Sequence, residues 1–333
     1  MNLVVLHQGA IGDFVLALSV IQAVRACTGA DRVLAIAGAP SARLAAGRSA
    51  VDAWLSPETA ALYTLFREGE PDGRLADCLK DADLILSFLS SPSDEIQHRL
   101  VRISGARVIS LDPRPTAETI ATRTHITAQW TAVIRTQGLA IPEPSPAQIR
   151  ISREGGACRP HSAPLPKTGD QRRAAMRILI HPGAGSPAKC WPAERFVALA
   201  DALAPATIHW MLGPAELECD PVRFAPIRQR VAARNEPLLV EEDLLRAAEH
   251  IANMDLYIGN DAGMTHIVAA LSIPTIAIYG PTDPNVWRPL GHHVRTVGPS
   301  TPSPITAVTT EAVLRASAAV RSSPFIARHD DPT

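Results

Sequence analysis

The stretch VVLHQGAIGDFVLALSVIQAVRA, residues 4–26, contains a hydrophobic strand, a short glycine-containing turn and an apolar helix in immediate succession. The turn is Gln8-Gly9-Ala10-Ile11-Gly12, and one carboxylate, Asp13, follows it at the start of the helix. A strand that leads into a helix through such a turn is typical of the βαβ units that build parallel sheets. Because a helix N-terminus favours negative charge, the turn is also a candidate ligand-binding loop.

The same alternation of apolar runs and helical patterns continues along the chain. We expect strands at 3–7, 32–37, 83–88, 107–111, 177–183, 207–213, 255–260 and 275–280, and helices at 13–26, 92–103, 192–204, 243–253, 262–271 and 306–320. The alternation stops at 153–175, where proline and glycine are frequent, as is typical of linkers. We therefore predict an α/β fold with two domains (1–155 and 176–308), a linker (156–175), a C-terminal helix (309–321) and a flexible tail (322–333).

Composition excludes several classes of protein. The 333 residues are 46% hydrophobic and 20% charged with a net charge of −1, which is typical of a soluble protein without the basic face that nucleic acid requires. The five cysteines are scattered and form no CxxC pair, which favours a reducing compartment and argues against a metal cluster. We recognise no signal peptide. The longest apolar stretch, 267–279, is interrupted by Pro274 and is too short to span a bilayer. We expect a cytoplasmic protein whose membrane contacts, if it has any, are peripheral.

The first loop does not match a dinucleotide site. Gly9 and Gly12 do not form a GxGxxG motif, and the second predicted strand ends in Ala37-Gly38, without an acidic residue for a ribose. Asp13 stands where a helix N-cap would stand, which is one interpretation of it. The other is a general base, because the same position keeps a carboxylate ionised beyond the strand ends.

The second candidate is HPGAGSPAKCWPAERFVALADAL, residues 181–203. Lys189 is not a Walker lysine, because Ala188 replaces the required glycine and Cys190 follows. Pro192 opens the next helix in the first-turn position. Lys189 is either a point charge for a phosphate or a solvated loop residue, and it is one of only three lysines, with Lys80 and Lys167.

The third candidate is DLYIGNDAGMTHIVAALSIPTIAIYGPTDP, residues 255–284. Asp261 precedes a helix whose first turn is Ala262-Gly263-Met264-Thr265, with small residues that expose backbone N–H groups and a hydroxyl on Thr265. This pattern predicts a diphosphate cradle, with His266 as a further donor and Thr282 in the neighbouring loop. The alternatives are a capping role for Asp261 and a half-buried helix position for His266.

Two weaker signals remain. Glu216 follows a predicted strand and turn, where its carboxylate either accepts from ribose hydroxyls or complements a helix dipole. The sequence Asp81-Ala82-Asp83 resembles the DxD of metal-dependent sugar transferases but precedes its strand, and no HxxxH spacing occurs on a helix. We therefore predict that no metal is required.

Together, the three stretches resemble the heptosyltransferase family of glycosyltransferases, family 9. The resemblance implies a GT-B fold, with two facing Rossmann-like domains and the active site in the cleft between them. It implies that the N-terminal domain binds a glycan or lipopolysaccharide-core acceptor and the C-terminal domain an ADP-activated sugar, usually ADP-L-glycero-D-manno-heptose. Transfer would invert the anomeric centre without a divalent metal, and the enzyme would be cytoplasmic or peripheral at the inner membrane.

The resemblance also implies residue roles. Asp13 matches the catalytic base, and Lys189 matches the lysine that contacts the donor. The other donor-side matches are Asp261 at the sugar, Gly263, Thr265 and His266 at the phosphate and sugar, and Glu216 at the ribose. The loop with Gly9, Ala10 and Gly12 faces the acceptor; many members carry Ser or Thr there, so the acceptor is not identified.

Three alternative functions remain open from the sequence. One is another GT-B enzyme, a UDP-sugar transferase or an epimerase. A second is a non-catalytic relative that binds a nucleotide sugar. The third, an NAD-dependent oxidoreductase, is disfavoured because the GxGxxG motif and the acidic strand end are missing.

Overall fold

The computed structural model describes residues 1–89, 94–151, 175–219 and 222–322. The chain forms two compact units, unit 1 (residues 1–150 and 285–287) and unit 2 (residues 151–284 and 288–333). Apart from their end positions 175 and 322, the expected linker and tail lie outside the described residues. The domain boundaries at 155 and 176 therefore stay predictions.

Unit 1 contains a five-stranded sheet in the order β3-β2-β1-β4-β5, in which every pair is parallel. Its strands are β1 (Asn2–His7), β2 (Arg32–Ala37), β3 (Ala53–Leu55), β4 (Leu84–Phe88) and β5 (Arg107–Ser110). Four of these confirm the predicted strands to within one residue at each end. Almost every residue of β1 and β4 is buried, as expected of parallel strands covered on both faces.

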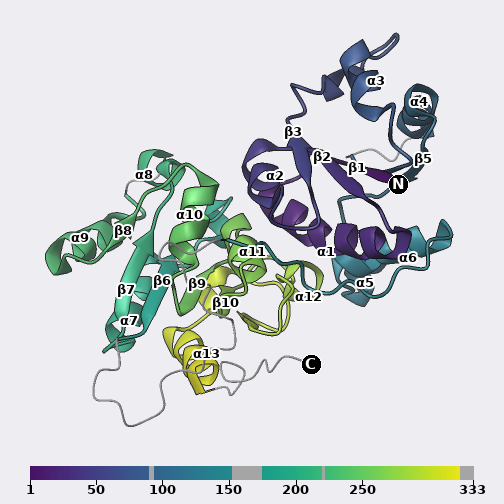
Figure 1. Cartoon of the computed structure of the whole chain (residues 1–333). Helices are drawn as coiled ribbons and strands as arrows, with labels where there is room; N and C mark the ends of the chain where they lie inside the picture. Colours follow the sequence, from purple (N-terminus) through teal and green to yellow (C-terminus); the bar gives the residue numbers. More distant parts are fainter. Residues whose placement is uncertain (90–93, 152–174, 220–221, 323–333) are drawn as a thin grey trace, which may run out of the picture. The chain divides into compact units, whose positions relative to one another are not determined.

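Helices cover both faces of this sheet (Figure 1). They are α1 (Ile11–Thr28), α2 (Ala39–Ala45), η1 (Leu62–Phe66), α3 (Gly73–Leu79), α4 (Asp94–Ser104), α5 (Ala117–Thr122) and α6 (Ile126–Thr136). Leucines of η1, α3 and α4 pack with Val4, Leu6 and Ile85 on one face. Helices α1, α5 and α6 lie on the opposite side of the sheet.

Helix α1 begins two residues before the apolar helix that we expected at 13–26. It is buried on most of its surface, with a continuous buried run from Phe14 to Ile21. A helix that is apolar on all sides belongs to a core. By length and composition alone α1 also qualifies as a membrane-spanning candidate, and 61% of that window is buried within the protein.

Unit 2 contains a six-stranded parallel sheet in the order β11-β10-β9-β6-β7-β8. Its strands are β6 (Arg177–His181), β7 (Thr207–Met211), β8 (Leu238–Leu239), β9 (Leu256–Asn260), β10 (Thr275–Ile278) and β11 (Val294–Val297). The strand order reverses between β6 and β9, and open α/β sheets bind ligands at the carboxyl ends of strands beside such a reversal.

The remaining helical elements belong to this unit, except that residues 285–287 of α12 are grouped with unit 1. They are η2 (Pro187–Lys189), α7 (Ala193–Ala202), α8 (Pro214–Cys219), α9 (Ala225–Arg234), α10 (Leu244–Ile251), α11 (Gly263–Ala270), α12 (Pro284–Trp287), η3 (Ile305–Ala307) and α13 (Thr310–Ser322). Pro192 is the N-cap of α7, one position before the first-turn site that we expected.

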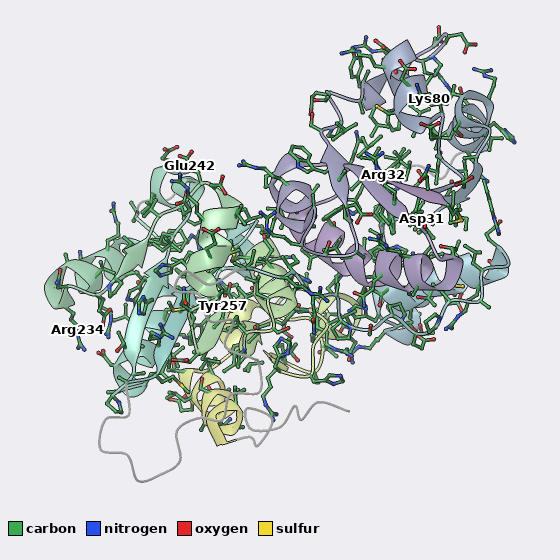
Figure 2. The ribbon with its side chains drawn as sticks, viewed as in Figure 1. Asp31, Arg32, Lys80, Arg234, Glu242 and Tyr257 are labelled. Atoms are coloured by element: carbon green, nitrogen blue, oxygen red, sulfur yellow. The ribbon has the colours of Figure 1, made fainter. Side chains whose placement is uncertain are left out.

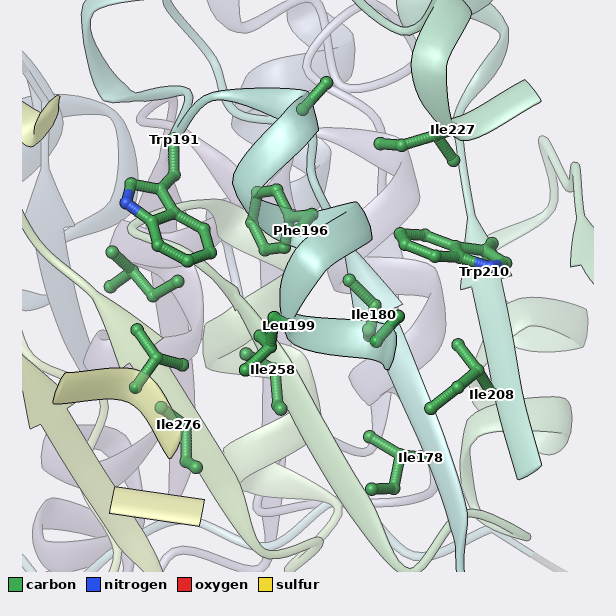
Figure 3. Packing of buried hydrophobic residues seen from close by; sticks show 14 of the residues in the cluster. Ile178, Ile180, Trp191, Phe196, Leu199, Ile208, Trp210, Ile227, Ile258 and Ile276 are labelled. Carbon is green, nitrogen blue, oxygen red and sulfur yellow. The ribbon is translucent and has the colours of Figure 1, made fainter. Parts of the chain in front are cut away.

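The main core of unit 2 lies between the sheet and helix α7. Alternate residues of neighbouring strands, among them Ile180, Trp210 and Ile258, face Phe196 and Leu199 of α7 (Figure 3). Because side chains alternate along a strand, one face of the sheet is filled by every second residue. The core fixes the strands in register, so that β6, β7, β9 and β10 end at one edge of the sheet.

Candidate functional site

In unit 1 the predicted base lies in the first turn of α1. Ala10 is the N-cap, so Asp13 is the third helical residue, and the N-cap position expected for it is wrong. Its Oδ2 accepts a hydrogen bond from the backbone N–H of Ala10 at 3.3 Å, as acidic residues at this position commonly do. The side chain is only half-buried. Asp13 therefore supports the turn and places a carboxylate beyond the end of β1.

A buried histidine lies beneath the same turn. His7 is 1% exposed, and its ring packs edge-on against Phe14 with 5.3 Å between centroids. Its Nδ1 accepts a hydrogen bond from the backbone N–H of Gly9 at 3.2 Å. A β-carbon on Gly9 would lie 2.9 Å from Cε1 of His7 and 3.1 Å from Oδ2 of Asp13. Glycine therefore allows the turn to pass close to both side chains.

The predicted acceptor loop is only partly accessible. Gly9 and Ala10 are exposed, whereas Gly12 is buried within α1. The packing of the helix covers Gly12. For all three residues, contact with a ligand stays a proposal.

We predict that His7 makes the stability of the protein depend on pH. Burial lowers the pKa of His7 to about 4, so between about pH 6.5 and 4 the unfolded chain binds a proton that the folded chain does not. The contribution of the neutral His7 to the free energy of unfolding is complete above pH 6.5. It is lost as the pH falls toward 4, and the loss is about 3 kcal/mol at most. Urea unfolding of the wild type and of His7→Gln at several pH values measures it. Equal pH slopes for the two proteins would contradict the prediction.

In unit 2 the predicted donor residues Lys189 and Asp261 are in direct contact. Lys189 Nζ donates to Oδ2 of Asp261 at 2.7 Å, and Thr282 Oγ1 donates to the same oxygen at 2.6 Å. The side chain of Asp261 is 7% exposed and that of Lys189 is 32% exposed. Burial, the charge of Asp261 and a hydrogen bond with it raise the pKa of Tyr279 well above its usual range.

This cluster decides between two pairs of interpretations. Lys189 is not a solvated loop lysine, because its ammonium pairs with a buried carboxylate. Asp261 is not a helix cap, because the N-cap of α11 is Ala262. The charge of Lys189 is thus balanced within the protein, and its remaining N–H groups are those that can face a ligand.

A buried asparagine holds the loop that carries Lys189. Asn260 is fully buried at the end of β9. Its Nδ2 donates to the carbonyl of Pro182 at 2.7 Å, and its Oδ1 accepts from the backbone N–H of Trp191 at 3.2 Å. The indole of Trp191 donates in turn to the carbonyl of Val308 at 2.9 Å. Both ends of the loop are therefore fastened to neighbouring elements.

The first turn of α11 agrees only partly with the predicted cradle. Ala262, Gly263 and Met264 are half-buried, and the N-cap makes no side-chain capping bond. Thr265 is fully buried, and its hydroxyl donates to the carbonyl of Asn260 at 2.5 Å. The expectation that this hydroxyl donates to a phosphate is wrong, because it has an internal acceptor. His266 is also buried, at 5% exposure, so its contact with a ligand stays a proposal.

Glu216 lies in the first turn of α8, at the carboxyl ends of β6 and β7. A β-carbon on Gly183 would lie 2.1 Å from Oε1 of Glu216, and one on Gly213 would lie 2.5 Å from Oε2. Any larger residue at either glycine would therefore displace the carboxylate. The side chain of Glu216 is 19% exposed. The arrangement places an acidic group beside the strand-order reversal, as the ribose interpretation requires.

Three buried polar residues of this edge, Asn260, Tyr279 and His181, were not among the predicted site residues. Each ends or directly follows an apolar strand. A polar residue at the end of an apolar strand predicts a specific hydrogen bond. The sequence does not say which residue is the partner in that bond.

Two further features concern ligands and metals. A pocket of about 890 Å³ opens beside the Lys189 loop, and its lining includes Pro187, Ala188, Pro281 and Pro304 but none of the predicted donor residues. Among the described residues, no group of three or more His, Cys, Asp or Glu side chains is arranged to hold a metal ion.

Curated relatives match one part of the chain. Lipopolysaccharide heptosyltransferase 2 of Escherichia coli (strain K12) is 34% identical over 119 residues, which is 35% of this chain. The match covers 34% of the length of that relative, so this chain spans only about a third of it.

Solved structures match nearly the whole chain and show the fold. The glycosyltransferase family 9 protein from Veillonella parvula has a TM-score of 0.70 at 15% identity, with 96% of each chain covered. E. coli heptosyltransferase WaaC with ADP has a TM-score of 0.66 at 17% identity, covering 96% of this chain and 100% of that one. A more distant neighbour is the iron-containing glycosyltransferase TibC of enterotoxigenic E. coli, with a TM-score of 0.53 at 10% identity, covering 97% of this chain and 78% of that one. The two parallel-sheet units are thus those of a GT-B fold.

The family model of glycosyltransferase family 9 (heptosyltransferase) matches residues 106–313, which is more than half of the chain. The match includes the Lys189 loop, Glu216 and the segment from Asp261 to Thr282. The chain therefore belongs to glycosyltransferase family 9, the heptosyltransferases.

Proposed function

We propose that the protein transfers a heptose from ADP-heptose to a lipopolysaccharide-core or related glycan acceptor, with inversion at the anomeric carbon and without a divalent metal. The observation that carries this proposal is the contact of Lys189 and Thr282 with Asp261 beside the N-terminus of α11. Cationic and backbone N–H donors at one sheet edge are suited to a diphosphate. Family membership and the names of the relatives support the choice of sugar.

In the proposed reaction, the carboxylate of Asp13 takes the proton of an acceptor hydroxyl. The hydroxyl oxygen then bonds to C1 of the sugar as the bond from C1 to the phosphate oxygen breaks, and ADP leaves with the bonding electrons. Negative charge grows on the leaving phosphate. Lys189 and the backbone N–H groups of Gly263 and Met264 are the groups that we propose to stabilise it. Asp261, which Thr282 and Tyr279 contact in turn, orients Lys189.

The other proposed residues have supporting roles. Glu216 binds the ribose, and His266 and Asp261 lie toward the sugar. Gly9 and Ala10 border the acceptor. We also propose a cytoplasmic location with peripheral contact at the inner membrane, because the proposed acceptor is built on a lipid.

Nucleotide choice tests the donor side of this proposal. We expect ADP to raise the melting temperature far more than UDP, since a ligand at about 100 times its Kd stabilises by about 2.7 kcal/mol. A mass-spectrometric assay with ADP-heptose and core acceptors ending in Kdo or an inner-core heptose tests transfer. The product should form equally in EDTA. Stronger stabilisation by UDP would contradict the ADP donor, and activity lost in EDTA and restored by Mg²⁺, Mn²⁺ or Fe²⁺ would contradict metal independence.

A further inference from the structure

A chain of buried hydrogen bonds runs beneath the proposed donor site. The hydroxyl of Tyr257 lies 3.1 Å from Nδ1 of His181 and 3.1 Å from Oγ1 of Thr265. Thr265 donates to the carbonyl of Asn260 at 2.5 Å. The two rings come from neighbouring strands, and Figure 2 shows Tyr257 within unit 2, away from the charged side chains labelled at its periphery.

We infer that His181 is a further donor-binding residue, a neutral imidazole whose unprotonated Nε2 accepts a hydrogen bond from a ribose hydroxyl of the nucleotide. This inference rests on the proposed function and extends it by one residue. The carbonyl oxygen of Asn260 can only accept a hydrogen bond.

The direction of each hydrogen bond follows from that carbonyl. The Thr265 hydroxyl has one proton, which it donates to the carbonyl of Asn260. In the contact between Thr265 and Tyr257, the Tyr257 hydroxyl must therefore be the donor and the Thr265 oxygen the acceptor. Tyr257 then has no proton left for His181, so Nδ1 of His181 must be the donor in their contact. A neutral imidazole carries one N–H. Nε2 is therefore bare and can only accept.

The bare nitrogen faces a second acceptor. Nε2 of His181 lies 4.0 Å from Oε1 of Glu216, too far for a direct hydrogen bond. Two acceptors side by side, with no proton between them, are suited to a ligand that brings two donors. The adjacent 2′- and 3′-hydroxyls of a ribose are such a pair, one for Glu216 and one for His181.

The fold holds both acceptors at the correct edge of the sheet. His181 is the last residue of β6, the strand at the order reversal, and Glu216 follows β7, its neighbour. Gly183 and Gly213 leave room only for the carboxylate of Glu216. On β9, where Gly259 pairs with His181, a β-carbon on Gly259 would lie 2.4 Å from the Tyr257 hydroxyl, so this glycine keeps space for the ring that fixes His181.

The charge state of His181 agrees with this role. Burial lowers its pKa, and the nearby charge of Glu216 opposes this only in part. The ring therefore remains neutral at physiological pH, as an acceptor at Nε2 requires.

Binding of ADP, 2′-deoxyADP and 3′-deoxyADP to the wild type and to His181→Asn tests the inference. Asparagine places its amide near the position of Nδ1, so it keeps a donor for Tyr257 but does not reach the position of Nε2. We expect the wild type to bind ADP about tenfold more tightly than one of the deoxy analogues. The His181→Asn variant should bind ADP and that deoxy analogue equally, with the affinity that the wild type has for the analogue. His181→Gln, whose amide reaches the Nε2 position, should restore part of the preference.

Matched variants distinguish this role from a structural one. Glu216→Gln should weaken the preference for the other hydroxyl, and His209→Asn in β7 should leave all affinities unchanged. Nitrogen NMR of the wild type without ligand should find the His181 proton on Nδ1. A proton on Nε2, or an unchanged preference in His181→Asn, would overturn the inference while leaving the proposed function intact. A wild type that binds none of the three nucleotides would contradict the proposed function itself.

Discussion

The Asp13→Asn variant is expected to transfer sugar about 100-fold or more slowly than the wild type, because an amide cannot accept the proton of the acceptor hydroxyl. Folding should change little. The contact from the Ala10 N–H to Oδ2 can be made by the amide oxygen of asparagine, and the loss of negative charge in the first turn of α1 costs about 0.3–1 kcal/mol. ADP affinity should stay within about threefold, since the proposed donor residues belong to unit 2.

Single-turnover rates, ADP titration and urea unfolding measure these three effects separately. Asp72→Asn is the matched control, because Asp72 is the N-cap of α3 in the same unit and accepts from the backbone N–H of Arg74 at 2.8 Å. It should show a similar small change in stability and an unchanged rate. Normal turnover of Asp13→Asn would reduce Asp13 to a residue that supports the turn. A joint loss of stability and ADP binding would show that the two half-sites are not separable.

The second large effect is expected for Lys189→Ala, which should weaken binding of ADP and of the ADP-sugar by about 10- to 100-fold. The variant loses a charge-assisted contact of about 1.5–3 kcal/mol with the diphosphate. It also leaves the carboxylate of Asp261, 7% exposed, without its cationic partner. An uncompensated negative charge beside the diphosphate adds repulsion to the lost attraction.

A double-mutant cycle separates these two contributions. Asp261→Asn in the Lys189→Ala background should recover part of the ADP affinity, because it removes the repulsive charge. Lys80→Ala is the control, since Lys80 is 62% exposed and pairs with Asp77 at 3.7 Å on the surface of unit 1. It should change nothing measurable. Unchanged donor affinity and rate in Lys189→Ala would remove Lys189 from the proposed site.

The strands that the sequence did not indicate share a physical cause. Strands β3, β8 and β11 have only two to four residues, and none of their residues is fully buried. Short edge strands carry little hydrophobic periodicity, and their place in the sheet comes from pairing with a neighbour. The central strands were predictable because burial on both faces requires continuous apolar runs.

The sequence by itself determined the alternation of strands and helices, and with it the strand ends at which the candidate residues lie: Asp13 in unit 1, and Lys189 and Asp261 in unit 2. These properties depend on neighbouring residues, through side-chain periodicity and turn chemistry. Only the tertiary structure decided which side chains meet there. Lys189 and Asp261 are 72 residues apart in the sequence, and His181 and Tyr257 are 76 residues apart. Strand order and register bring these residues together, because contacts across a sheet are set by which strands lie side by side and not by distance along the chain. The same packing buries the hydroxyl of Thr265.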